Sequence, residues 1–109
     1  MKIFNINNDN TKVTLRLGQN AKENHSLIDD ADPNDWWFHL DELPSGHCIV
    51  EKLELNNDII KKAAIIVKEN TKYKNLGMVK VKYLQIKNIK KTKNPGEVTL
   101  LKKGNVIVI

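Results

Sequence analysis

Apolar and polar residues alternate from the start of the chain as far as Leu17, which predicts a β-hairpin. Its expected strands are Lys2–Ile6 and Lys12–Leu17, joined by a turn at Asn7–Asn10. Asn20 is then a candidate N-cap for a short helix that has to stop before Pro33. The beginning of the chain is therefore expected to form two strands followed by a helix.

A second, longer helix is predicted by apolar residues that recur on one stripe. Ile59, Ala63 and Val67 are spaced one helical turn apart, and the expected N-cap is Asn57 or Asp58. The remaining predicted strands are Trp36–Leu40, His47–Leu53, Met78–Ile86, Val98–Leu101 and Val106–Ile109. The pattern predicts the α+β class, with residues 1–109 forming a single domain: a mostly antiparallel β-sheet with two α-helices packed against it.

The strand expected at Trp36–Leu40 is rich in aromatic side chains. Period-two geometry places Trp36 on the same face as Phe38, and Trp37 on the opposite face with His39. Trp36 is expected in the core. Two interpretations stay open for Trp37, which can offer a plane for base stacking or pack beneath a binding site.

Charge divides the chain into two unlike halves. Residues 1–58 carry a net charge of −6, whereas residues 59–109 carry thirteen lysines against two acids, a net charge of +11. Such asymmetry favours a polyanionic partner. The chain also has 17 lysines, 14 asparagines and 12 isoleucines against one arginine, which is typical of AT-rich codon usage. Codon bias accounts for lysine in place of arginine, but it does not explain why acids are so rare in the second half.

Lysines concentrate at two places in the basic half. Lys80 and Lys82 alternate with apolar residues in an expected strand, and Lys90 and Lys91 lie in the connection before Pro95. A lysine-lined strand and loop can follow a phosphate backbone, because each contact releases a counterion. A solvated strand face without a ligand is the alternative interpretation.

Membrane and secretory classes find no support in the sequence. The longest apolar run, Ala63–Val67, is far too short for a transmembrane helix, and the amino terminus lacks the pattern of a signal peptide. Cys48 is the only cysteine, which excludes a disulfide framework. These features predict an intracellular, cytoplasmic chain without a membrane partner.

Enzymatic and metal chemistry is disfavoured as well. The densest group of functional side chains is Asp35, Trp37, His39, His47 and Cys48. The two histidines are expected side by side, but their spacing matches no metal signature, and a zinc site needs at least a third ligand. No nucleophile accompanies a histidine base, and no glycine-rich phosphate loop is present. We therefore predict no catalytic residue, no metal and no cofactor, and we disfavour a metal-dependent or histidine-based hydrolase.

Ordered motifs along the chain resemble those of a known domain family. Residues 18–24 read Gly-Gln-Asn-Ala-Lys-Glu-Asn, residues 35–39 read Asp-Trp-Trp-Phe-His, and residues 44–47 read Pro-Ser-Gly-His. In this order they resemble the NFACT-R domain, the RNA-binding domain of the NFACT proteins. The Lys-Lys-Thr at residues 90–92, followed by Pro-Gly-Glu at residues 95–97, is similar to the closing motif of that family.

The resemblance implies an RNA-binding domain that contacts structured RNA, such as tRNA or rRNA. In large NFACT proteins this domain resembles one module of a ribosome-associated quality-control factor, which makes the ribosome a candidate partner, although the resemblance does not carry ribosome recruitment over to this chain by itself. The sequence contains neither a further domain nor a coiled coil, and we expect a standalone version of the domain. The expected nucleic-acid-binding residues are Asn20, Lys22, Asn24, Trp37, His39, His47, Lys80, Lys82, Lys90 and Lys91.

Each of these residues also has a structural interpretation. Asn20 and Asn24 lie one helical turn apart, so both amides can face a ligand at the positive end of the helix, but Asn20 can also serve as a cap alone. His39 and His47 can donate to phosphate or simply be hydrogen-bonded within the fold. Gln19 stands where the family has arginine, which removes a bidentate phosphate donor.

Two other functions remain open. A lysine surface does not distinguish RNA from DNA without contacts to the 2′-hydroxyl, so DNA is the alternative polymer. A protein-interaction module that docks on a ribosomal or quality-control partner is the second alternative.

Overall fold

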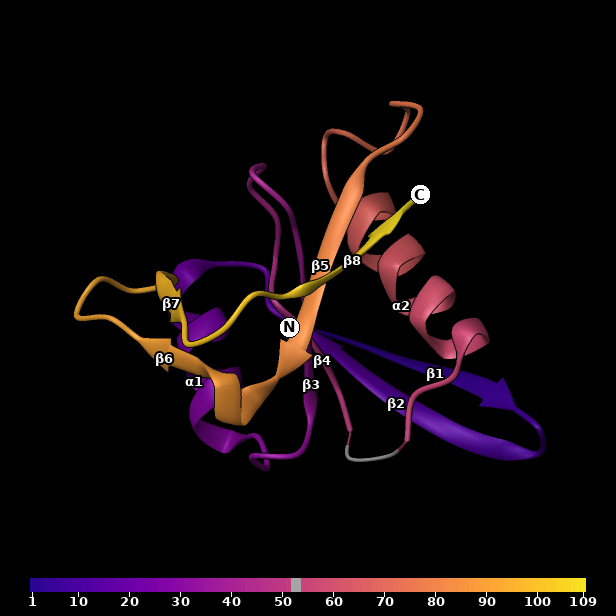
Figure 1. Cartoon of the computed structure of the whole chain (residues 1–109), viewed down its shortest axis with the longest axis horizontal. Helices are drawn as coiled ribbons and strands as arrows, with labels where there is room; N and C mark the ends of the chain where they lie inside the picture. The colour runs from indigo at the N-terminus through magenta and orange to yellow at the C-terminus, as the bar shows by residue number, and fades with distance from the viewer. Residues whose placement is uncertain (52–53) are drawn as a thin grey trace.

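The structure is a computed structural model that describes residues 1–51 and 54–109. Within these residues, six strands form one antiparallel sheet in the order β1-β2-β4-β3-β5-β8, and β6 pairs with β7 in a separate two-stranded sheet (Figure 1). The strands are β1 (Lys2–Asn8), β2 (Thr11–Leu17), β3 (Trp36–Leu40), β4 (Cys48–Val50), β5 (Lys80–Gln85), β6 (Ile89–Lys91), β7 (Val98–Leu100) and β8 (Asn105–Val108). The helices are α1 (Ala21–Asp30) and α2 (Asn57–Glu69), and a 3₁₀ turn, η1 (Ile86–Asn88), follows β5.

The predicted α+β class is confirmed, and both helices and the amino-terminal hairpin are present. Two predicted strands are shorter than expected. β4 covers Cys48–Val50, and the end of the longer strand predicted there lies at residues 52–53, outside the described residues. β5 begins at Lys80 because Met78 adopts a φ of 44°, a left-handed conformation that interrupts a strand. Val79 still exchanges two hydrogen bonds with Ile109, at 2.7 and 2.8 Å.

The pattern predicted β7 but missed β6, the strand that pairs with it. Lys90 and Lys91 were expected in an irregular connection, but both belong to β6, whose Ile89 pairs with Leu100 of β7. Ile89 is buried, and Leu100 packs on the same core. The three residues of β6 are too few to show an alternating pattern, so pairing with a later segment decides their conformation.

Both helices begin at an asparagine cap. The Asn20 side chain accepts a hydrogen bond from the backbone N–H of Glu23, as expected for α1. The cap of α2 is Asn56, one residue before the predicted position, and its side chain accepts from the N–H of Ile59. These bonds satisfy backbone donors that the first turn of a helix leaves free.

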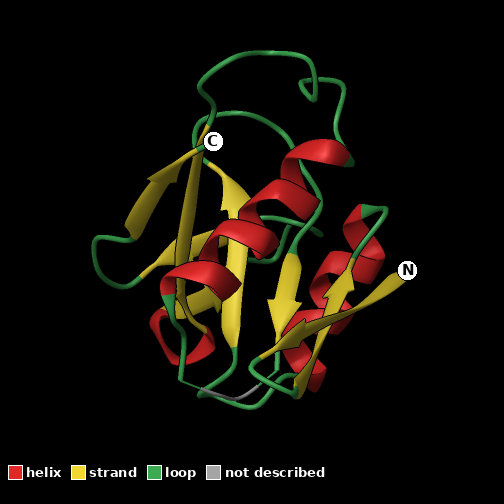
Figure 2. Cartoon of the chain, turned by 90° about the vertical axis from the view of Figure 1, so that its right-hand side faces the viewer, coloured by secondary structure: helices red, strands yellow, loops and turns green. Residues whose placement is uncertain are grey.

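The sheet is covered on both faces. α2 packs against one face through a buried stripe, and Figure 2 shows this helix crossing the strands. α1 and the β6–β7 hairpin cover part of the other face, where Leu27 and Ile28 join Leu84 and Ile89 in a second core. The sheet therefore buries apolar side chains at both odd and even positions of its central strands.

The two tryptophans lie on opposite faces of the sheet, as predicted, but the inward-facing Trp36 is the less buried of the two. Trp36 packs against the α2-side core but remains half-buried, with its ring centroid 6.1 Å from that of Tyr83. Trp37 is the more deeply buried of the two, with 1% of its surface exposed. Trp37 belongs to the core beneath α1 and the β6–β7 hairpin.

Neither of the two α-helices that the described residues form combines the length and apolarity that crossing a lipid bilayer demands.

Two buried alanines of α2 supply a test of this packing. Ala63 and Ala64 are fully buried, so a larger side chain has no space there. We expect Ala64→Leu to lower the free energy of unfolding by about 1–3 kcal/mol, measured by urea denaturation. Lys61→Leu, on the exposed side of the same helix, is the control and should change it little. Unchanged stability in Ala64→Leu would contradict the packing.

Candidate functional site

The Gly-Gln-Asn-Ala-Lys-Glu-Asn motif forms a joint between α1 and the loop that joins β3 to β4. Asn24 is buried, and its Oδ1 accepts the backbone N–H of His47 at 3.1 Å. The N–H of Gly18 donates to the carbonyl of His47 at 3.0 Å. A Cβ on Gly18 would lie 2.0 Å from Asn24 Oδ1, so only glycine fits. The Asn24 amide, predicted to face a ligand, is instead used to hold His47.

Two further motif glycines allow close backbone approach at the same place. A Cβ on Gly46 would lie 2.2 Å from the carbonyl oxygen of Gly18. Gly96, at the tip of the β6–β7 hairpin, has a φ of +80°, and a Cβ there would lie 3.0 Å from that of Ala21. The start of α1, the β3–β4 loop and the hairpin tip are therefore packed backbone to backbone, and we name these contacts the glycine joint.

The amino end of α1 already carries a carboxylate. Glu23 accepts hydrogen bonds from the backbone N–H of Gln19 and from the amino-terminal ammonium of Met1, both at 2.9 Å. Both hydrogen bonds lower the pKa of Glu23, and the bond from the ammonium group has the larger effect. Because this negative charge offsets the positive end of the helix dipole, the helix end alone is a poor site for a phosphate. Asn20 and Lys22 are exposed beside it.

Trp37, His39 and His47 form one aromatic cluster beside the glycine joint. The ring of Trp37 stacks on His39 at a centroid distance of 5.4 Å and meets the edge of His47 at 5.4 Å. His47 is 1% exposed, and burial lowers its pKa to about 3, with nearby charge on His39 and His25 adding to the effect. Burial also lowers the pKa of His39. Trp37 and His47 have almost no surface to offer, which favours the packed interpretation for both.

Lys80 and Lys82 project from the sheet face opposite α2. Val79 and Val81, which alternate with them, are buried on the α2 side. The Lys82 ammonium lies 5.9 Å from the Trp37 ring centroid and 4.0 Å from a carboxylate oxygen of Asp41. Lys80 is exposed, and no ion pair is formed by it within the described part of the chain.

The two lysines of β6 have different surroundings. Ile89 points into the core, so Lys90 points to the outer side of the hairpin, where it is exposed. Lys91 turns toward α1 and forms an ion pair with Asp29. Lys90 is therefore more available to an external anion than Lys91.

The sheet order separates the two charged halves of the sequence. β1, β2, β4 and β3 come from the acidic half and are contiguous, whereas β5 and β8 from the basic half lie together at one end. The link from β7 to β8 passes over β5, since a Cβ on Gly104 would lie 3.8 Å from that of Lys82. Lys102 and Lys103 directly precede Gly104 on this link.

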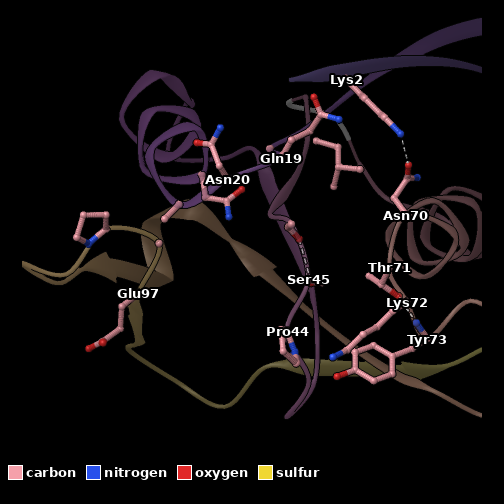
Figure 3. Close-up of a pocket in the computed structure, with 17 residues that line it drawn as sticks. Lys2, Gln19, Asn20, Pro44, Ser45, Asn70, Thr71, Lys72, Tyr73 and Glu97 are labelled. Atoms are coloured by element: carbon pink, nitrogen blue, oxygen red, sulfur yellow. Dashed lines mark hydrogen bonds between the residues drawn. The ribbon is translucent and has the colours of Figure 1, made fainter.

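A groove of about 860 Å³ lies beside the glycine joint (Figure 3). Five segments line it: Lys2, residues 17–21 with Asn24, residues 44–46, residues 70–73 and residues 95–97. Of the binding residues predicted from the sequence, Asn20 and Asn24 line this groove, whereas Gln19, Lys72 and Tyr73 also line it and were not predicted. Only the adjacent lysine and tyrosine after α2 hinted at binding, and nothing local showed that this segment meets α1.

Among the described residues, no three histidine, cysteine or acidic side chains converge in a way that could hold a metal ion. Burial raises the pKa of the Cys48 thiol to about 12, so this residue is a core side chain rather than a nucleophile.

Comparison with known proteins relates the whole chain to one family. The model of the NFACT protein RNA binding domain matches residues 1–109. The chain is 30% identical over 99 residues to the Rqc2 homolog RqcH of Bacillus subtilis (strain 168), an overlap of 88% of this chain and 17% of that protein. It is 32% identical over 94 residues to coiled-coil domain-containing protein 25 of Bos taurus, covering 77% of this chain and 44% of that one. The chain thus spans less than half the length of these relatives.

A solved structure has the same fold. The C-terminal part of the fibronectin/fibrinogen-binding protein from Streptococcus suis matches with a TM-score of 0.86 and 21% sequence identity. The overlap covers 100% of this chain and 45% of that one.

The buried amide of Asn24 provides a test of the glycine joint. Asn24→Ala leaves the N–H of His47 buried without an acceptor, so we expect the free energy of unfolding to fall by about 1–3 kcal/mol. Asn75→Ala, at an exposed turn, is the control and should stay within about 0.5 kcal/mol of the wild type. Equal stabilities of the two variants in urea denaturation would contradict the role of Asn24.

The lowered pKa of His47 predicts a loss of stability in mild acid. The folded state keeps His47 neutral down to about pH 3, whereas the unfolded chain binds a proton below about pH 6.5. Stability is therefore fully present above pH 6.5 and falls as the pH drops toward 3. Between pH 7.5 and 5 we expect a loss of about 2 kcal/mol from His47, with a further loss in the same direction from His39.

Urea denaturation at the two pH values measures this loss. His47→Gln should be less stable at pH 7.5 but lose less on acidification than the wild type. The same pH dependence in both proteins would rule out His47 as its source.

Proposed function

The chain belongs to the NFACT RNA-binding domain family, and from this premise we propose that it binds structured RNA, such as tRNA or rRNA, through the lysines of its basic half. The family relation supports an RNA-binding module. The polymer, the surface and a cytoplasmic, ribosome-associated setting are parts of the proposal.

One observation carries the choice of surface. The sheet order gathers β5 and β8 at one end, and the β6–β7 hairpin lies on the sheet face that Lys80 and Lys82 share. Lys90 points outward from that hairpin, so the side chains of all three lysines point away from α2. A phosphate backbone lying across this end of the molecule would meet several cations without passing the acidic strands.

The chemistry of the side chains favours recognition by charge and shape. Lysine ammonium groups act as point charges on phosphates and carry little information on base identity. Lys91 is partly neutralised by Asp29, and Trp37 and His47 are buried. The proposed phosphate-binding residues are therefore Lys80, Lys82 and Lys90, together with neighbouring lysines. Trp37 and His47 support the strand that carries the site instead of touching the ligand.

A protein partner is the second candidate, because apolar side chains share this face. Val106 and Val108 are 48% and 45% exposed and pair in register with Lys82 and Lys80, and Met78, which is 82% exposed, lies two residues before Lys80. An exposed apolar patch beside cations also fits docking on an acidic protein surface. If a substitution at Met78 abolishes the biological activity of the chain while its affinity for RNA is unchanged, the protein partner is favoured.

A titration against labelled tRNA and duplex DNA at about 50 and 200 mM salt tests the proposal. We expect tRNA to bind more tightly than DNA and both to weaken with salt. Lys80→Ala/Lys90→Ala should lower affinity and remove up to about two phosphate contacts from the salt slope. The control Lys12→Ala/Lys61→Ala makes the same change in net charge on β2 and α2 and should have the smaller effect.

The outcomes separate the candidates. Equal affinity for tRNA and DNA would contradict selectivity for RNA. Equal loss in the two double variants would contradict the proposed surface. A chain that binds neither polymer at low salt would overturn nucleic-acid binding and favour the protein partner.

A further inference from the structure

We propose that the groove beside the glycine joint binds an unpaired segment of the RNA, an inference that rests on the proposed function. The groove is distinct from the lysines of β5 and β6, none of which lines it. Its walls come from α1, the β3–β4 loop, the segment after α2 and the hairpin tip (Figure 3). The glycine joint holds three of these segments in contact. A preformed site of this kind avoids the cost of ordering loops on binding.

Many polar groups around the groove are already satisfied. Ser45 Oγ accepts from the N–H of Leu40 and donates to the carbonyl of Gly46. Thr71 Oγ1 donates to Lys68 and accepts from Tyr73. These hydroxyls stabilise the walls and leave little for a ligand.

Several of the groups that remain are hydrogen-bond donors. Asn20 uses Oδ1 as a cap and Gln19 uses Oε1 on the terminal ammonium, which leaves the amide NH₂ of each side chain without a partner among the described residues. On the opposite wall, the Lys72 ammonium lies 5.5 Å from the centroid of the Tyr73 ring, beside the phenol (Figure 3). Because unused hydrogen-bond donors lie on two walls, the groove suits a ligand that is rich in acceptor oxygens.

Charge and size narrow the ligand to single-stranded RNA. Lys2 and Lys72 add positive charge, while the one acid that lines the groove among the described residues, Glu97, already accepts the Asn94 amide at 3.2 Å. Phosphate and ribose oxygens match unused amide and ammonium donors. The volume of about 860 Å³ lies within the range of pockets that hold a small ligand, so nucleotides fit and a duplex does not. The ring of Tyr73 adds an aromatic surface of the type that stacks with unpaired bases.

Two RNA hairpins test the inference: one with a blunt stem, and one with the same stem and a 3′ extension of about four unpaired nucleotides. The wild type should bind the extended hairpin about ten-fold more tightly in fluorescence anisotropy. Asn20→Asp should bring this ratio close to one, because aspartate keeps the helix cap but places a carboxylate where the ligand binds. Lys72→Ala should also lower the ratio.

Matched controls separate the groove from net charge. Asn75→Asp and Lys74→Ala make the same chemical changes on an exposed segment that does not line the groove, and they should leave the ratio unchanged. Thermal unfolding of Asn20→Asp should match the wild type, which confirms that the cap is intact.

The result can overturn the inference without touching the proposed function. Wild-type binding of both hairpins with equal affinity would show RNA binding without a groove for unpaired nucleotides. A preserved ratio in Asn20→Asp and Lys72→Ala would do the same. Failure to bind either hairpin would instead overturn the proposed function, and the groove inference with it.

Discussion

The hydrogen bond from the backbone N–H of His47 to the side chain of Asn24 is the contact on which the functional end of the molecule depends. This hydrogen bond is buried, so its loss would leave the N–H of His47 with neither water nor a protein group to accept it. It also fixes the distance between α1 and the β3–β4 loop, which Gly18 and Gly46 make possible by having no side chain. The groove and the aromatic cluster both sit beside this joint, and both take their shape from it.

The motif residues that identify the family are therefore largely structural. Trp37 and His47 are each 1% exposed, and Asn24 is 7% exposed. Burying two histidines next to a lysine costs stability in acid, since the neutral rings are the form that the core accepts. The motifs at residues 18–24, 35–39 and 44–47 largely describe how the domain is held together, while the surfaces that we propose for RNA carry Lys72, Lys80 and Lys90.

The order of the strands in the sheet separates in space the charges that are separated along the sequence. An acidic first half and a basic second half need not separate in space, because strands from both halves could have alternated in the sheet. Here β5 and β8 lie together at one end, and Gly104, which follows Lys102 and Lys103 in the sequence, lies against β5. The strands of the basic half therefore share one end of the sheet, and charge asymmetry of this kind favours the approach of a polyanion.

The sequence by itself determined the elements whose signals are local. The alternation through Leu17, the apolar stripe of α2 and the cap at Asn20 each depend on a few neighbouring residues, so α+β could be predicted. Only the tertiary structure decided that Ile89 pairs with Leu100, that Trp37 is covered, and that Asn24 turns inward. Each of these outcomes depends on segments distant in sequence meeting in space, and period-two or helical spacing carries no information about which segments meet.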